Sequence, residues 1–104
     1  MRRAVLIAMS ALLTLDVRAA DLDGRELFNH KCAMCHGAVG MGTGLLARRM
    51  PPAVAPLEKR EDLSAAYVER AARIGILNMP PITRADVSDA QLASIAHYLS
   101  KGRP

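Results

Sequence analysis

Two cysteines and a histidine lie within five consecutive residues, in Cys32-Ala33-Met34-Cys35-His36. Thiols three positions apart project from one face of a helix. Both can then add to the two vinyl groups on one side of a porphyrin, while the adjacent imidazole reaches the iron, which is the C-x-x-C-H chemistry of c-type haem attachment. The motif therefore predicts one covalent haem c per chain, bound through Cys32 and Cys35, with His36 as an axial iron ligand.

Three other kinds of site could use the same residue types. A structural zinc site needs four ligands, and the remaining histidines, His30 and His97, do not form a second pair of closely spaced zinc ligands. A thioredoxin-like redox pair would need a βαβ context, which the surrounding sequence does not offer. A disulfide across so short a loop would restrict the unfolded chain very little. Haem attachment is favoured because it also suits a small exported domain.

The iron needs a sixth ligand or keeps an open site. The candidate donors carry a thioether or an imidazole and are Met34, Met41, Met50, Met79, His30 and His97. Met34 and Met41 lie too close to His36 in the chain to reach the opposite haem face. Met50 and Met79 both precede proline pairs, but Met79 follows a helical segment and Met50 stands only 14 residues after His36. We therefore predict Met79 as the second axial ligand and interpret Met50 as a packing methionine.

The first nineteen residues are typical of an export signal. Arg2 and Arg3 precede an apolar run over residues 4–15, and small residues follow at 19 and 20. The run is shorter than the 18 or so apolar residues that a membrane span needs. We expect cleavage after Ala19 or Ala20, which leaves residues 20–104 as one periplasmic domain without a membrane span.

Composition limits what this domain can be. A chain of 104 residues is at most one small domain, and although 51% of it is hydrophobic, it has only two Tyr, one Phe and no Trp. Its net charge is +4, and the predicted signal holds three of the arginines and one aspartate, so the remainder carries +2. No basic run accompanies aromatic residues, which argues against nucleic-acid binding. An alanine-rich domain of this size buries little apolar surface, so it needs a further stabilising element, such as a cofactor in its core.

We expect the domain to consist of helices, because no segment has a convincing strand pattern. These helices would position the predicted haem-binding residues. Residues 37–44 are dense in glycine and are expected to form a loop. Ser64 is a good N-cap and Gly75 a good C-terminal stop, while Ser88 and Gln91 form a capping box. Tyr67 is expected in the core. The expected helices of this all-α domain span residues 22–34, 45–49, 64–75 and 88–101.

The whole of residues 20–104 resembles a class I (monohaem) cytochrome c. The resemblance is carried by Cys32-x-x-Cys35-His36, the Gly40-Met41-Gly42 turn, the 64–75 helix, Met79-Pro80 and the terminal Tyr98-Leu99. It implies the small all-α fold of that family. It also implies that Gly24 and Phe28 of the first helix pack across the last helix near Tyr98.

A closer likeness is to the cytochrome c subunits of p-cresol methylhydroxylase and eugenol hydroxylase-type flavocytochromes. It is carried by Ala66-Tyr67-Val68, Arg73-Ile74-Gly75, Asn78-Met79-Pro80 and Ile95-Ala96-His97-Tyr98-Leu99. The likeness implies electrons from a FAD-containing flavoprotein subunit that oxidises a 4-alkylphenol. Thr43 stands where such cytochromes usually carry a proline whose carbonyl accepts a hydrogen bond from the proximal histidine. A carbonyl survives this change, so His36 is still expected to be oriented by it.

With His36 and Met79 both on the iron, no position remains for a substrate, so the expected function is one-electron transfer and not enzymatic catalysis. The electron acceptor would be a copper protein, a cytochrome or an oxidase. Arg48 and Arg49 are candidate partners for the haem propionates. Two alternatives stay open: a free soluble carrier that feeds a terminal oxidase, and a haem sensor with a displaceable sixth ligand.

Overall fold

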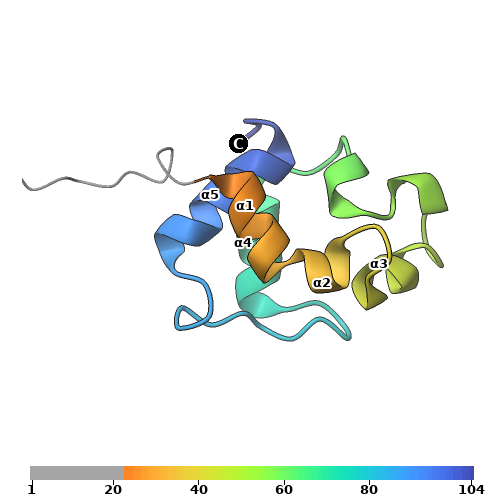
Figure 1. Ribbon diagram of the computed structural model, residues 1–104, viewed down its shortest axis with the longest axis horizontal. Coiled ribbons are helices and arrows are strands. Elements are labelled where there is room, and N and C mark those ends of the chain that lie inside the picture. Colours follow the sequence, from red (N-terminus) through yellow and green to blue (C-terminus); the bar gives the residue numbers. More distant parts are fainter. Residues whose placement is uncertain (1–22) are drawn as a thin grey trace, which may run out of the picture.

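The computed structural model describes residues 23–104 (Figure 1). The predicted export signal and its cleavage site lie outside the described residues. Between residues 23 and 104 no strand forms beyond one isolated bridge, so the all-α prediction is confirmed. The helices are α1 (Gly24–Lys31), α2 (Ala33–His36), α3 (Met41–Leu46), α4 (Ala65–Ile74) and α5 (Asp89–Ser100), with 3-10 turns η2 (Pro52–Val54) and η3 (Leu57–Lys59).

The main core lies where α5 packs against both α1 and α4. Figure 1 shows these three helices gathered in one part of the molecule, with α2, α3 and the 3-10 turns in another. Phe28 from α1 and Ile95 from α5 are its largest fully buried side chains. Burial of such side chains gives about 1.5–3 kcal/mol each. The other buried members of this core are Leu63, Ala72, Val87, Leu92 and Leu99.

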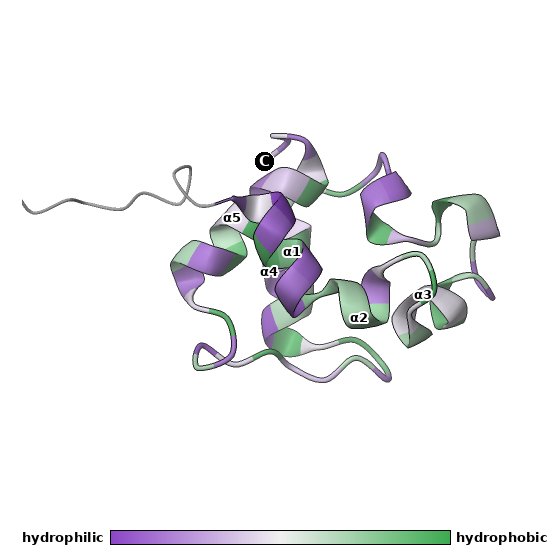
Figure 2. Ribbon diagram, in the orientation of Figure 1, coloured by the Kyte–Doolittle hydropathy of each residue, from purple (hydrophilic) through white to green (hydrophobic). Residues whose placement is uncertain are grey.

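The crossing of α1 and α5 depends on a glycine. A methyl group placed on Gly24 would lie 2.8 Å from Tyr98 Cβ and would overlap the Ser94 carbonyl oxygen. One turn further along α1, the ring of Phe28 packs on that of Tyr98, with 6.1 Å between centroids and a tilt of 51°. The expected packing of the first helix across the last near Tyr98 is therefore confirmed. Figure 2 shows the remainder of α1 as mostly hydrophilic. This agrees with its burial, since Phe28 is the only buried residue of this helix.

The predicted ends of α4 and α5 are confirmed. The Ser64 hydroxyl accepts a hydrogen bond from the backbone N–H of Tyr67, and Gly75 ends α4 with φ +78°. At α5 the Ser88 hydroxyl accepts from the Gln91 N–H at 3.2 Å, and the Gln91 side chain accepts from the Ser88 N–H at 3.0 Å. These caps provide hydrogen bonds to backbone groups that helix ends otherwise leave unpaired.

Three expectations about the first half of the domain were wrong in detail. The expected helix over 22–34 is broken at Cys32, whose φ of −124° is not helical, and this starts a new turn of helix. The glycine-dense segment is not a loop throughout, since α3 begins at Met41 and continues through Gly42 and Gly44. Packing of α3 against α2 and a hydrogen bond from the Thr43 hydroxyl to the Gly37 carbonyl (2.5 Å) offset the low helix propensity of glycine. The helix expected at 45–49 ends instead at Leu46.

Tyr67 was expected in the core, but 49% of it is exposed. Val68 and Ala72, four residues apart, lie on the face of α4 that packs on the core. Successive residues of a helix are rotated by about 100°, so Tyr67 points away from that face. In the part of the chain that the structure describes, no helix has the length and apolar character to cross a membrane.

Candidate functional site

The Cys32–His36 motif occupies the corner between α1 and α2. The Cys32 carbonyl accepts hydrogen bonds from the backbone N–H groups of Cys35 (3.2 Å) and His36 (2.9 Å). These bonds place the three predicted site residues of this motif on one turn of helix. Within the described range neither thiol is in a disulfide, and both cysteines are half-buried. The thiols are therefore chemically available on a single short element.

Burial sets the protonation state of this motif. Desolvation, followed by the neighbouring Cys35, raises the pKa of the Cys32 thiol to about 11. Desolvation also lowers the pKa of His36 below the ordinary histidine value of 6.5. The imidazole is consequently neutral at neutral pH, which is the form that binds a metal.

The imidazole of His36 packs against the backbone of α3. A methyl group placed on Gly42 would lie 3.0 Å from Cε1 and 3.2 Å from Nδ1 of the ring. Nδ1 is buried and has no hydrogen-bond partner in the described part of the chain. The expectation that the Thr43 carbonyl orients His36 is therefore wrong, because no hydrogen bond joins Nδ1 to that carbonyl, which accepts one from the Ala47 N–H (2.9 Å) within the helix. Close packing by Gly42 holds the ring instead.

Met79 lies in a tight turn after α4. Its N–H donates to the Ile76 carbonyl (2.9 Å), and its carbonyl accepts from the Ile76 N–H (3.1 Å). Leu77 inside this turn has φ +52°. Gly75 lets the returning chain approach the end of α4, since a methyl group there would lie 2.6 Å from the Met79 carbonyl oxygen. The Met79 side chain is half-buried and packs against the core.

The other candidate sixth ligands lie in different surroundings. Met34 and Met41 are 88% and 71% exposed. His30 is exposed on α1, where its imidazole lies 3.9 Å from the Glu26 carboxylate, and His97 is exposed on α5. Of these side chains, none packs against the core as Met79 does, within the residues that the structure describes.

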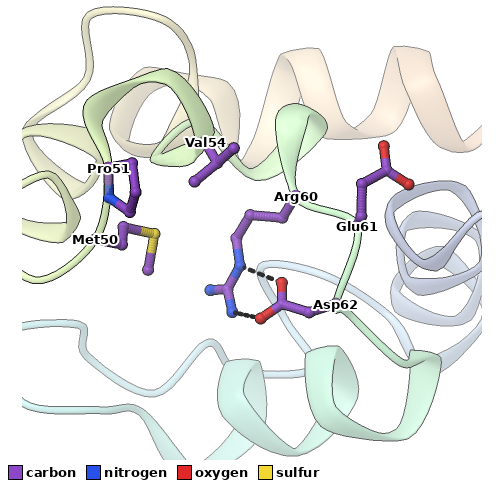
Figure 3. Close-up of a pocket in the computed structure, with 6 residues that line it drawn as sticks. All are labelled: Met50, Pro51, Val54, Arg60, Glu61 and Asp62. Atoms are coloured by element: carbon purple, nitrogen blue, oxygen red, sulfur yellow. Dashed lines mark hydrogen bonds and ion pairs between the residues drawn. The ribbon is translucent and has the colours of Figure 1, made fainter.

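Met50 lines a cavity of about 330 Å³ between the α3 end of the domain and the segment before α4. Figure 3 shows the side chains of Met50 and Arg60 extending toward the same space. The guanidinium of Arg60 donates to both carboxylate oxygens of Asp62, at 2.8 and 2.9 Å. The residues around this cavity are Met50, Pro51, Val54, Arg60, Glu61 and Asp62.

Arg60 is the cationic residue that the sequence analysis missed. Its side chain is only 16% exposed, whereas Arg48 and Arg49, the predicted propionate partners, are both exposed. In the sequence Arg60 stands within a run of charged residues, 58–62, that is typical of a solvated surface. Its low exposure depends on tertiary packing, which this run of charges does not reveal.

A second surface beside the Met79 turn is apolar and uncovered. A hollow of about 140 Å³ lies there, and its neighbours Ile74, Ile76 and Leu77 are exposed to between 43% and 73%. Exposed apolar side chains gathered in one place mark a surface that another apolar group covers. The residues that line the hollow are Tyr67, Arg70, Ala71, Ile74, Gly75 and Ile76.

The residues present fit a covalently attached haem. Two free thiols and a half-buried imidazole lie on one helical turn, a thioether lies in a turn held at the end of α4, and an apolar surface beside it is exposed. By contrast, residues 23–104 hold no group of three or more His, Cys, Asp or Glu side chains that could bind a bare metal ion.

Comparisons with known proteins give a match at the level of the family. No curated protein and no solved structure matches the chain. The sequence model of the family described as "Cytochrome C oxidase, cbb3-type, subunit III" matches residues 19–99. This match covers most of the chain and agrees with the helical fold and the haem-binding residue types, and it lends no support to the finer likeness to flavocytochrome subunits. The chain belongs to this family of c-type cytochromes, whose domain binds haem c covalently and transfers electrons.

Proposed function

We propose that the chain is a periplasmic one-electron carrier in which Cys32 and Cys35 attach the haem and His36 and Met79 are its axial ligands. The observation that carries the proposal is the helical turn that presents two free thiols beside a half-buried, neutral imidazole. Each thiol would add across a vinyl double bond of the haem, so that sulfur joins one carbon and hydrogen the other, and no oxidant would be consumed. The bound haem supplies the one-electron couple.

The protein's own residues hold the proposed haem ligands in place. Gly42 lets α3 pack directly on the His36 ring, so the imidazole keeps one orientation. The turn between Ile76 and Met79 holds the thioether near the end of α4. A methionine opposite a histidine raises the reduction potential relative to harder ligands. Held by His36 and Met79, the iron would be shielded from small molecules by the chain's own side chains.

The ligand assignment is tested by exchanging the two proline-flanked methionines separately. Met79→Ala should abolish the far-red methionine-to-iron absorption band of the oxidised protein. Met50→Ala, the matched control, should keep it. A band that persists in Met79→Ala and disappears in Met50→Ala would reverse the assignment. Ready binding of carbon monoxide by the reduced wild-type protein would favour a sensor with a displaceable ligand.

Arg60 is proposed to bind a carboxylate of the haem. Its planar guanidinium suits bidentate carboxylate binding, and it already forms such a pair with Asp62 at the edge of a cavity. Arg60→Gln should lower the reduction potential, since a nearby cation favours the less positively charged, reduced state. Arg49→Gln, which changes an exposed arginine, should leave it almost unchanged. Equal shifts in the two variants would contradict this role.

The electron donor is proposed to be a FAD flavoprotein that oxidises a 4-alkylphenol, and the acceptor an oxidase. The likeness around Tyr67, Arg73 and Met79 supports the donor, and the family description, which names an oxidase, supports the acceptor. Stopped-flow mixing of the oxidised cytochrome with such a flavoprotein and its alkylphenol should reduce the haem within turnover time. Reduction no faster than by an unrelated flavoprotein would remove this donor and favour a free carrier.

Export is proposed to bring the chain to the compartment where haem is attached. The support is the charged and apolar pattern of residues 1–19. The intact mass of the protein from a periplasmic extract should correspond to a chain that begins at residue 20 or 21 plus one haem. A mass that includes residues 1–19 would contradict cleavage.

A further inference from the structure

Arg73 joins three segments of the protein at one point. It lies in the last turn of α4, and only 18% of its side chain is exposed. Its Nη1 donates to the Ile82 carbonyl at 3.0 Å, and its Nη2 donates to Oδ1 of Asp89 at 2.8 Å. The planar guanidinium therefore links the end of α4 to the chain that returns from Met79 and to the first turn of α5.

The position of Ile82 makes this link important for Met79. Pro80 and Pro81 follow Met79, and proline has no N–H to donate. Ile82 is consequently the first residue after Met79 whose backbone can donate a hydrogen bond, and its N–H binds the Ala72 carbonyl at 2.7 Å. Arg73 binds the carbonyl of the same residue. Both backbone groups of Ile82 are thus held by α4, and they close the loop that carries Met79.

We propose that Arg73 is a positioning residue for Met79, which keeps the methionine on the iron by holding Ile82 against α4 and α5. The inference rests on the proposed role of Met79 as axial ligand. When the guanidinium is removed, the loop from Gly75 to Ile82 loses one of its two anchors on α4. A larger fraction of molecules then has Met79 displaced, and the affinity for an external ligand rises in proportion to that fraction.

The test is an imidazole titration of the oxidised holoprotein, followed by loss of the far-red methionine band. Arg73→Gln should bind imidazole about tenfold more tightly or better, which corresponds to loss of one hydrogen bond from a charged donor. Arg73→Lys keeps the charge but not the planar fork, so its affinity should fall between those of wild type and Arg73→Gln.

Two control variants separate positioning from general destabilisation. Arg84→Gln removes the other partner of Asp89 (3.1 Å) without touching Ile82, so it should change imidazole affinity by less than about twofold. Ser64→Ala removes the cap at the opposite end of α4 and should lower the melting temperature without tightening imidazole binding. Thermal unfolding by circular dichroism ranks the variants by stability.

The outcomes decide the proposal. Wild-type imidazole affinity in Arg73→Gln overturns it, and so does an equal gain of affinity in Ser64→Ala. If Arg73→Gln yields no holoprotein, Arg73→Lys and Asp89→Asn replace it, and wild-type affinity in both overturns the proposal. A far-red band that persists in Met79→Ala is a different result, because it removes the ligand assignment itself.

Discussion

The two sides of the proposed haem site are held in different ways. On one side, Cys32, Cys35 and His36 lie within one helical turn and are joined by hydrogen bonds to the Cys32 carbonyl. On the other side, Met79 lies in a turn whose far end is held through Ile82 by α4, and through Arg73 by the start of α5. The first arrangement is local in sequence, and the second needs the helices to be packed.

This difference predicts an order of failure. Hydrogen bonds within five residues form whenever that stretch is helical, so the attachment side tolerates damage elsewhere in the domain. The methionine side opens when any of its anchors weakens, because local segments of a protein open at lower free energy than the whole fold. We therefore expect changes to the core or the loop to release Met79 while haem stays attached.

The largest effect is expected from removal of the local motif itself. The double variant Cys32→Ser and Cys35→Ser should have no covalently attached haem, because a hydroxyl does not form the thioether. Met34→Ala changes the exposed residue between the two cysteines and should attach haem normally. A pyridine haemochrome spectrum and haem staining of the denatured protein measure this. Haem that stays attached in the double variant would show that other residues hold it.

On the methionine side, Gly75→Ala should destabilise the fold by about 1–3 kcal/mol through backbone strain alone. The new methyl group would also press on the Met79 carbonyl oxygen, at 2.6 Å. We expect haem to remain attached and the far-red methionine band to weaken. Gly102→Ala is the control, since its φ is likewise positive (+80°) while its methyl group would be 3.7 Å from His97 Cε1. It should keep the band, and parallel loss of the band in both variants would contradict the comparison.

A smaller effect is expected on the histidine side from Gly42→Ala. Its methyl group would lie 2.8 Å from the Cys35 carbonyl oxygen and 3.0 Å from the His36 ring. The crowding should cost about 1–3 kcal/mol, and the better helix propensity of alanine offsets up to about 1 kcal/mol of this. Gly44→Ala in the same helix meets nothing within 4 Å and should be neutral or stabilising. Thermal unfolding measures both, and equal melting temperatures would show that Gly42 does not confine His36.

The smallest effect concerns acid stability at the anchor on α5. The hydrogen bond from Arg84, and then that from Arg73, holds the pKa of Asp89 below the ordinary value of 3.8. A carboxyl whose pKa is lower in the folded state stabilises the fold above its unfolded pKa, and this contribution is lost as pH falls through the folded pKa. Asp89→Asn should therefore lower the melting temperature slightly at pH 7 and by less at a pH below the ordinary value of 3.8. An equal loss at both pH values would contradict an ionic contribution.

Much of the fold could be predicted from local patterns. Ser64, Gly75 and the Ser88–Gln91 capping box mark the ends of α4 and α5 correctly, because capping involves residues a few positions apart. The break at Cys32 and the helix through Gly42 and Gly44 could not be predicted in this way. They depend on the packing of α2 against α3, which outweighs the weak helix propensity of glycine.

The same distinction applies to the site. The spacing of Cys32, Cys35 and His36 indicates haem attachment without any knowledge of the fold, and the placement of Met79 after a helix favours it over Met50. The sequence did not indicate the exposure of Tyr67 or the low exposure of Arg60. Nor did it indicate that, among residues 23–104, His36 Nδ1 has no hydrogen-bond partner. Each of them depends on which distant segment happens to lie beside the residue.

The sequence by itself therefore determined the kind of cofactor, the residues expected to attach it and the all-α class of the domain. These follow from chemistry and hydrogen bonding within one or two turns of helix. Tertiary structure decided how the methionine loop is anchored, because Arg73 meets Ile82 and Asp89 only after α4 and α5 have packed. It also decided that Gly42 packs on the His36 ring and that Arg60 turns toward a cavity, since both depend on chain segments brought together by folding.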